Sequence, residues 1–586
     1  MSISATTRTP AAPTRSRAVT VLAWTAFLLG AFAYRLGFGL LSEFWFEDET
    51  QVFLIGLRHH ATGAWPYFGA DIVWTHSQIP GALLGLLVGV PMDIVPVPEA
   101  PFVLLNVLSL GALALLAWYI CRRLPELPRW LVWGWLLFIP WTLQYSTHVI
   151  NPSYVLCAAI VFFVGFFEAL PRFSLRRVPR FAANFMMGAA VLWIMQIHMS
   201  WPLLVSFVLL ALWTQFTEGG PAGLLRRRSP DIGGERRRAG RGLQQLGLAV
   251  LGLLAGSALT GSLLLPTFWN YGILGGSGDT HRNFTIHMQG GTALVTTLAR
   301  VFSFASLEIS RFLGLDTARR LQFLLAHPWL IPFTAVVFVA GIVQPVWMAA
   351  SWFRTRSARA EWSALKWLVV GTVLVVYFAY WFVIEPPQAH SFYLLAPLAF
   401  MYAFYCWSFV DSRRWRTVAA VVLACSLVYH AGVVIGRAPE RSLYRNREVA
   451  AAAVLHKMPD VLGHRRGDAK EGAPPPDVFV QAPALTEVRL ASATWSRGTA
   501  GMLLWTMRLE NESATNAYRD VYYHATYRDT TGRLVGDYYN VIGEVLQPGE
   551  SVTLQGVNHG FIPPFASAEI KLLRVERLVQ LGRFLK

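Results

Sequence analysis

Long apolar runs alternate with short polar segments over the first 436 residues of the chain. A helix needs about 20 mostly apolar residues to cross a bilayer, and eleven of the runs approach that length. The runs predicted to cross lie at residues 19–40, 101–121, 130–147 and 153–170, as a pair within 181–217, and at 243–265, 328–353, 366–384, 391–410 and 417–436. The pattern predicts an α-helical polytopic membrane domain over residues 18–436.

A shorter apolar run at residues 79–96 is not predicted to cross. Pro91, Asp93, Pro96 and Pro98 interrupt it, and proline breaks helical hydrogen bonding. The acidic segment before it and the basic segment 122–129 belong on opposite sides of the membrane, so only one crossing fits between them. We therefore expect this run to form a re-entrant or surface-lying helix.

Arginine clusters between the runs predict the orientation, because cytoplasmic loops carry an excess of Lys and Arg. Residues 1–17 are polar, Pro-rich and basic, so we expect a disordered cytoplasmic N-terminus. No cleavage pattern follows the first span, which is expected to be retained. The chain is then a multi-pass protein of the cytoplasmic membrane, with outer loops at 41–100 and 266–327 and an extracytoplasmic C-terminus.

The chain changes character after the last run. Residues 437–476 are polar and end in Gly472-Ala473-Pro474-Pro475-Pro476, which predicts a linker. Apolar residues then alternate with a period of two, and turn signals separate the segments. Residues 477–586 are predicted to form a β-sandwich outside the membrane. This domain has no cysteine and no cluster of His, Asp and Glu, so docking or shielding is favoured over chemistry.

Composition supports a membrane protein and argues against other classes. Of the 586 residues, 54% are apolar and 14% are charged, too hydrophobic for a soluble protein. The net charge of +16 does not indicate nucleic acid, because the arginines fall between apolar runs. The cysteines lie in or at the ends of apolar runs with no metal-type spacing, and no cofactor or metal is indicated. These cysteines are Cys121, Cys157, Cys406 and Cys425.

The stretch Phe44-Trp45-Phe46-Glu47-Asp48-Glu49-Thr50 places three carboxylates just beyond the first span. Charge at the edge of a span is costly and often functional. The alternative is that the three acids only mark the end of a helix at the water interface.

Several short motifs together resemble a known superfamily. Asp48-Glu49 is followed by Gly63-Ala64-Trp65 and His76-Ser77-Gln78-Ile79-Pro80, and His390-Ser391-Phe392-Tyr393-Leu394 opens a late run. In this order they resemble GT-C membrane glycosyltransferases, above all the protein O-mannosyltransferase and aminoarabinose transferase branch. The resemblance covers about residues 20–410. Asn151-Pro152 stands where some members have a second Asp, which argues against a metal-assisted site.

The resemblance implies transfer of a sugar from a polyprenyl phosphate donor to a hydroxyl of a glycan, lipid or protein acceptor. A carboxylate must accept the hydroxyl proton, and Asp48, beside Glu49, matches that base. Cations must hold the phosphate that leaves. The candidates for substrate and phosphate binding are Arg58, His59, His60, His76, Arg282, His390 and Tyr393. Arg58 follows Asp48 by ten residues, so one continuous helix would put both on a shared face.

Other interpretations stay open. The arginines are also typical of lipid headgroup anchors, and the histidines of interface residues. Gly275-Gly276-Ser277-Gly278 belongs either to a loop that closes over substrate or to a simple connection. A transporter or flippase would need charges inside the spans, and the interior spans look almost free of them. A non-catalytic assembly protein is the third possibility.

Overall fold

The computed structural model describes most of the chain, in segments. The described residues are 17–42, 47–71, 78–219, 232–272, 294–295, 317–354, 360–379, 381, 389–438, 443, 447–457, 486–497, 503–542, 544, 546–559, 562 and 564–577. The chain divides into two compact units, residues 1–463 and residues 464–586.

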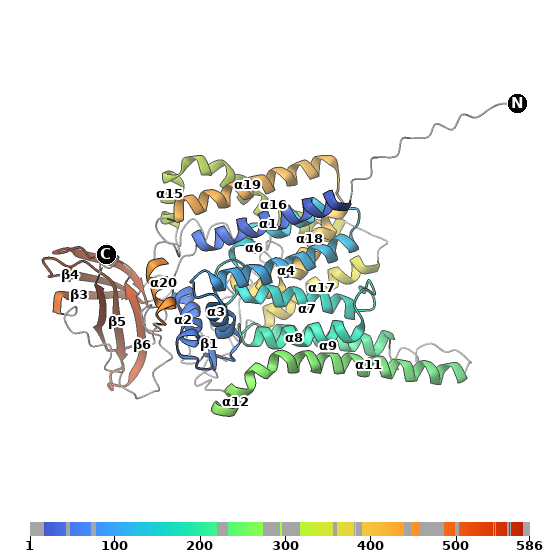
Figure 1. Ribbon diagram of the computed structural model, residues 1–586, viewed down its shortest axis with the longest axis horizontal. Coiled ribbons are helices and arrows are strands. Elements are labelled where there is room, and N and C mark those ends of the chain that lie inside the picture. The colour runs from blue at the N-terminus through green and yellow to red at the C-terminus, as the bar shows by residue number, and fades with distance from the viewer. Residues whose placement is uncertain are drawn as a thin grey trace. The chain divides into compact units, whose positions relative to one another are not determined.

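The first unit is helical, with one small hairpin (Figure 1). Its described α-helices are α1 (Arg17–Ser42), α2 (Glu47–Thr62), α3 (Leu83–Ile94), α4 (Ala100–Arg123), α5 (Arg129–Phe138), α6 (Pro140–Gln144), α7 (Ser153–Ala169), α8 (Arg180–Met195), α9 (Pro202–Gly219), α11 (Ile232–Gly261), α12 (Leu265–Tyr271), α15 (Thr317–Ala326), α16 (Ile331–Arg354), α17 (Ala360–Ala379), α18 (Ala396–Ser408), α19 (Arg413–Arg437) and α20 (Arg447–Leu455). Short 3₁₀ segments are η1 (Ser262–Leu264), η3 (Pro328–Leu330) and η5 (Ala389–Leu395), and the hairpin pairs β1 (Phe68–Asp71) with β2 (Gln78–Pro80).

Within the described residues, six helices are long and apolar enough to cross a membrane. They are Ala18–Ser42, Ala100–Arg123, Gln244–Tyr271, Pro328–Phe353, Glu361–Ala379 and Arg413–Arg437. Shorter apolar helices accompany them at Leu83–Ile94, Ser153–Ala169, Arg180–Met195, Pro202–Thr217 and Phe392–Ser408. The unit is therefore a multi-pass membrane domain, and the number of eleven crossings stays a prediction.

The first and last of these spans run in the same direction. The Tyr34 hydroxyl of α1 donates to the carbonyl of Leu427 on α19 at 2.8 Å. One turn further along, the rings of Phe38 and His430 lie 5.2 Å apart. Because both helices advance together, the chain crosses the membrane an odd number of times between the start of α1 and the end of α19, as the predicted topology requires.

The run at residues 130–147 is not the single helix that the sequence predicted. It forms α5 and α6, separated by Ile139 in an extended conformation, with φ −83° and ψ 157°. Pro140 begins α6. Proline lacks an N–H and excludes the helical conformation from the residue before it, which explains the break.

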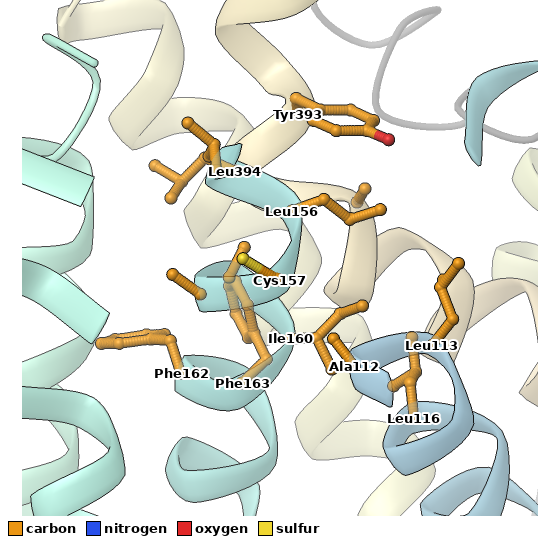
Figure 2. Packing of buried hydrophobic residues seen from close by; sticks show 14 of the residues in the cluster. Ala112, Leu113, Leu116, Leu156, Cys157, Ile160, Phe162, Phe163, Tyr393 and Leu394 are labelled. Atoms are coloured by element: carbon orange, nitrogen blue, oxygen red, sulfur yellow. The ribbon is translucent and has the colours of Figure 1, made fainter. Parts of the chain in front are cut away.

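The core of the membrane unit forms around α7. Nearly every residue of this helix is buried, which suits a helix that is apolar on all sides. Figure 2 shows Leu156 and Ile160 of α7 beside Leu113 of α4, with Tyr393 of η5 above them. The motif at residues 390–397 thus lies against the central helix.

The run at residues 79–96 contains α3, which has 12 residues. At 1.5 Å per residue it is about 18 Å long, against roughly 30 Å of hydrocarbon. A helix of this length does not cross a bilayer alone, in keeping with the expected re-entrant or surface-lying helix.

The second unit is a β-sandwich of antiparallel strands. In its described part, β3 (Val488–Arg497), β4 (Leu503–Asn511) and β7 (Ser551–Asn558) form one sheet in the order β3-β4-β7. The other sheet has the order β6-β5-β8, with β5 (Tyr518–Arg528), β6 (Leu534–Ile542) and β8 (Ser567–Arg577). Burial alternates along β4, so the predicted period of two reflects one face on the core.

A buried polar network lies in the core of the sandwich. His559 is fully buried, and its Nε2 lies 2.7 Å from the Tyr523 hydroxyl. Trp505 Nε1 donates to the Tyr527 hydroxyl at 2.8 Å, and that hydroxyl contacts His559 Nδ1. Because the Tyr527 hydroxyl accepts from Trp505, it donates its own hydrogen to His559 Nδ1. The Nε2 atom of His559 then carries the ring hydrogen and donates to the Tyr523 hydroxyl. Burial lowers the pKa of His559 to about 4, so the ring is neutral at pH 7.

The predicted linker at residues 437–476 holds structure that the sequence analysis missed. Residues Arg447–Leu455 form α20, and Ala450, Ala453 and Val454 are buried. The division between the two units falls after α20, between residues 463 and 464, so α20 belongs to the first unit. Alanine is the strongest helix former, and the alanine run of this segment was the signal.

Candidate active site around the acidic helix

The acidic stretch forms the first turn of α2. Glu47, Asp48 and Glu49 are the first residues of the helix, where the unpaired N–H groups and the helix dipole favour negative charge. The side chain of Glu49 is 4% exposed. The side chains of Glu47 and Asp48 lie outside the described residues. The backbone therefore places all three acidic residues in the first turn of one helix.

Close packing on α3 positions α2. A Cβ at Gly56 would lie 2.4 Å from Val88 Cγ1, and one at Gly89 would lie 2.7 Å from the Gly56 carbonyl oxygen. Gly85 approaches Pro66 and Ile55 in the same way. Small residues spaced by four let helix backbones approach closely. The two helices are in direct contact, so α3 acts as a support for the acidic helix.

The Gly63-Ala64-Trp65 motif ends α2. Gly63 has φ +67°, a conformation that favours glycine. Its N–H donates to the His59 carbonyl at 2.8 Å, which satisfies one of the last carbonyls of the helix. His59 Nδ1 in turn lies 2.9 Å from the Ala64 carbonyl oxygen. The turn that resembles the family motif is thus a helix cap that fixes where the chain leaves α2.

The β1–β2 hairpin anchors this loop to the membrane helices. Thr267 of α12 donates to the Tyr67 carbonyl at 2.7 Å. A Cβ at Gly81 would lie 2.4 Å from Gln196 Cγ, just beyond α8. The hairpin tip, which includes His76, lies outside the described residues.

Two adjacent histidines, His59 and His60, lie in the last turn of α2, at the end opposite the acids. His60 Nδ1 lies 2.7 Å from Asp93 Oδ1, and His60 Nε2 lies 3.0 Å from the Val454 carbonyl oxygen of α20. His59 Nε2 is 3.9 Å from Asp93 Oδ2. Arg447 of α20 also pairs with Glu99, before α4, at 2.5 Å. These contacts join α2, α3 and α20, so His60 is a buried structural residue.

The structure does not bring Asp48 and Arg58 together, although both lie on one continuous helix, α2. Ten helical residues advance about 15 Å and turn about 1000°, which leaves the two positions about 80° apart around the axis. The predicted shared face followed from the number of helical turns alone and left out the rise of about 1.5 Å per residue. Arg58 and His59 lie at the end of α2 that is remote from the acidic turn.

A buried cation in the first span escaped the sequence analysis. Arg35 of α1 has 0% of its surface exposed. Its guanidinium donates to the carbonyls of Leu137 at 2.8 Å and Thr142 at 3.2 Å, and to the Ser146 hydroxyl. The break at Ile139-Pro140 frees the Leu137 carbonyl at the end of α5, and the Thr142 carbonyl lies in the last turn of α6. A lone arginine in one apolar run and a proline in another were the two signals.

The motif at residues 390–397 packs beside this cation. Tyr393 is 0% exposed, and its hydroxyl donates to the Trp141 carbonyl at 3.3 Å. Its ring lies 5.3 Å from that of Trp141 and 5.2 Å from that of Tyr145. Tyr393 is therefore packed in the protein interior. This position does not support its expected role as a phosphate ligand.

The remaining predicted residues fall outside the described part. Arg282 lies in a segment that is not described, and the side chain of His390 is not described. Among the described residues, no group of three or more His, Cys, Asp and Glu side chains is placed to hold a metal ion.

Comparisons with known proteins by sequence found nothing. No protein-family model matches the chain, and no curated protein matches it.

Comparison with solved structures found distant neighbours. ArnT from Cupriavidus metallidurans in the apo state is 12% identical with a TM-score of 0.42, covering 76% of this chain and 78% of its own. The undecaprenyl phosphate-bound form of that protein gives 12% and 0.41, with 75% and 79% covered. Arabinosyltransferase EmbB from Mycobacterium smegmatis is 14% identical with a TM-score of 0.34, covering 99% and 65%.

One of these neighbours, EmbB, is named as an arabinosyltransferase. At these identities and TM-scores the similarity carries no argument about function, which has to come from the site.

Proposed function

We propose that this protein is a membrane glycosyltransferase. It transfers one sugar from a polyprenyl phosphate donor to a hydroxyl of a glycan, lipid or protein acceptor at the outer face of the cytoplasmic membrane. The observation that carries the proposal is the acidic turn of α2, packed on α3 at the end of the membrane unit where α1 and α19 also end (Figure 1).

Asp48 is the proposed general base. A sugar hydroxyl is a weak nucleophile at neutral pH, and a carboxylate that accepts its proton during attack contributes roughly 10² to 10⁴ in rate. The N-terminus of α2 stabilises the ionised carboxylate, which keeps it ready to accept that proton. Attack on the face opposite the phosphate would invert the anomeric carbon. Glu49, one residue away from Asp48, is buried in the same helical turn.

The departing lipid phosphate needs cationic partners. Arg58 and His59 lie about 15 Å from the acidic turn along α2, too far for one reacting bond. We therefore assign the phosphate to His76, Arg282 and His390.

The distribution of charge supports the proposed orientation. Arg123, at the end of α4, donates to the carbonyl of Phe173 and lies 3.7 Å from Glu361, at the start of α17. These contacts join arginine-rich helix ends at the end of the membrane unit opposite α2. Under the positive-inside rule that end is cytoplasmic.

A transporter is less well supported. It would need charges along a path through the membrane. The spans contain a few buried charges, but Arg35 in the first span is held by helix-end oxygens. Glu168, at the other end, accepts from the backbone N–H groups of Leu175 and Arg177. Arg35 and Glu168 therefore both form hydrogen bonds to backbone groups inside the protein.

The test compares Asp48→Asn with Glu47→Gln in a deletion strain. The readout is mass spectrometry of envelope glycans and of prenyl phosphate sugars, at matched membrane abundance. We expect Asp48→Asn to lower transfer about 10²-fold or more, and the neighbouring control to change it less than about threefold. Normal glycans with Asp48→Asn would support an inert assembly protein instead. A lipid-linked precursor that accumulates in the inner leaflet after deletion would support a flippase.

A further inference from the structure

An apolar groove runs between α1 and α19. Its volume is about 300 Å³, and it is lined by Ala33, Tyr34, Gly37, Phe38, His430, Ala431, Val434 and Ile435. The groove exists because small residues face each other on the two helices. A Cβ at Gly37 would meet no atom within 4 Å. The contacts of Tyr34 with Leu427 and of Phe38 with His430 hold the helices in register on either side of it.

The groove lies at membrane depth. Both helices are membrane spans by length and composition, and the lining residues fall in the halves nearer Ser42 and Arg437. The same two helices expose large apolar side chains: Leu29 of α1 is 63% exposed, and Ile435 of α19, which lines the groove, is 65% exposed. Within a bilayer, a surface of this kind faces hydrocarbon and not water.

The dimensions select the kind of occupant. A helix of a second copy is about 10 Å across with its side chains, and the groove offers only about 300 Å³ between two helices already in contact. A single flexible hydrocarbon chain fits that space. It would also supply the dispersion contacts that the small side chains leave unmade.

We infer that this groove is a binding site for one acyl chain of a phospholipid from the leaflet on the α2 side. The chain lies along Ala33 and Gly37 on one wall and along Ala431 and Val434 on the other. It fills the space behind the segment of α1 that carries Arg35, and so fixes the span that leads into α2. The inference is independent of the proposed transferase activity.

The test uses the full-length protein in nanodiscs that contain a phospholipid with a diazirine on one acyl chain. After irradiation, mass spectrometry maps the labelled peptides. We expect labelling on both α1 and α19 at the lining residues. Gly37→Leu should lower it at least about fivefold, because the new side chain occupies the groove without a clash. Ala33→Leu, on the same wall, should act in the same direction.

Gly30→Leu is the matched control. Gly30 also has no atom within 4 Å of an added Cβ, but it does not line the groove, so labelling should stay within about twofold of the unaltered protein. Unchanged labelling with Gly37→Leu would mean general lipid contact and would overturn the inference. Loss of labelling on addition of polyprenyl phosphate would assign the groove to a prenyl chain, and crosslinks between two copies would assign it to a protein interface. Either result would overturn it as well.

Discussion

The acidic turn of α2 and the buried guanidinium of Arg35 both lie at helix ends, where backbone groups lack helical partners. The acids lie at an N-terminus, which favours negative charge, and the arginine lies against the C-terminal ends of α5 and α6, which favour positive charge. Arg35 donates its hydrogen bonds to oxygens inside the protein. The acidic turn holds three carboxylates on one helical turn at the edge of the membrane unit. The same electrostatics thus supports structure in one region and proposed chemistry in the other.

The largest effect on stability should come from removing the buried cation. Arg35→Met keeps an apolar stem but removes the hydrogen bonds that the guanidinium donates to the Leu137 and Thr142 carbonyls and to the Ser146 hydroxyl. Ser146 still donates to the Thr142 carbonyl. A hydrogen bond to a charged group contributes roughly 1.5–3 kcal/mol, so the loss of these bonds should cost about 4 kcal/mol. The measurement is thermal unfolding in nanodiscs.

Arg35→Lys separates charge from geometry. Lysine keeps the charge but cannot fan out to all of these acceptors, so the Arg35→Lys variant should unfold at a temperature between those of the Arg35→Met variant and the unaltered protein. If Arg35→Met unfolds at the original temperature while transfer stops, the arginine serves chemistry, and the contrast with the acidic turn fails.

A smaller effect concerns a buried group that stays neutral. Because the pKa of His559 is lowered to about 4 in the folded sandwich, against roughly 6.5 when unfolded, the unfolded chain binds more protons between these values. The stability that the neutral ring provides is complete above about pH 6.5 and declines as the pH falls towards about 4, by about 3 kcal/mol in all.

Hydrogen exchange of the sandwich amides in the full-length protein, corrected for intrinsic rates, measures this decline. His559→Gln should abolish the pH dependence. Protection that stays constant from about pH 7 to about pH 4.5 would contradict the expected protonation of the ring.

The smallest of the three changes tests how α2 is held. Gly89→Leu places a side chain against the Gly56 carbonyl and His59, and overpacking of this kind costs about 2 kcal/mol. We expect a lower unfolding temperature and slower transfer, since α3 no longer fits against the acidic helix. Gly30→Leu, which meets open space, is the control. An unaltered unfolding temperature with Gly89→Leu would show that the helices have room to separate.

The sequence predicted the helical membrane domain, the β-sandwich and the position of the three acids just beyond the first span. Those features follow from local patterns, namely apolar run length, a period of two and the run of carboxylates. The sequence did not predict the break at Pro140 or the role of Arg35. The break exposes a carbonyl that Arg35 binds, and the two residues are about one hundred positions apart in the chain. The burial of Tyr393 and the helix α20 likewise depend on tertiary packing.

Contacts between α20 and the acidic helix bear on how the membrane domain should be isolated. A fragment that stops at the end of α19 would lose Arg447, which pairs with Glu99, and the Val454 carbonyl, one of the two partners of the His60 ring. The shortest fragment that keeps α2 in place should therefore extend to Lys457, past the boundary that hydropathy alone would choose.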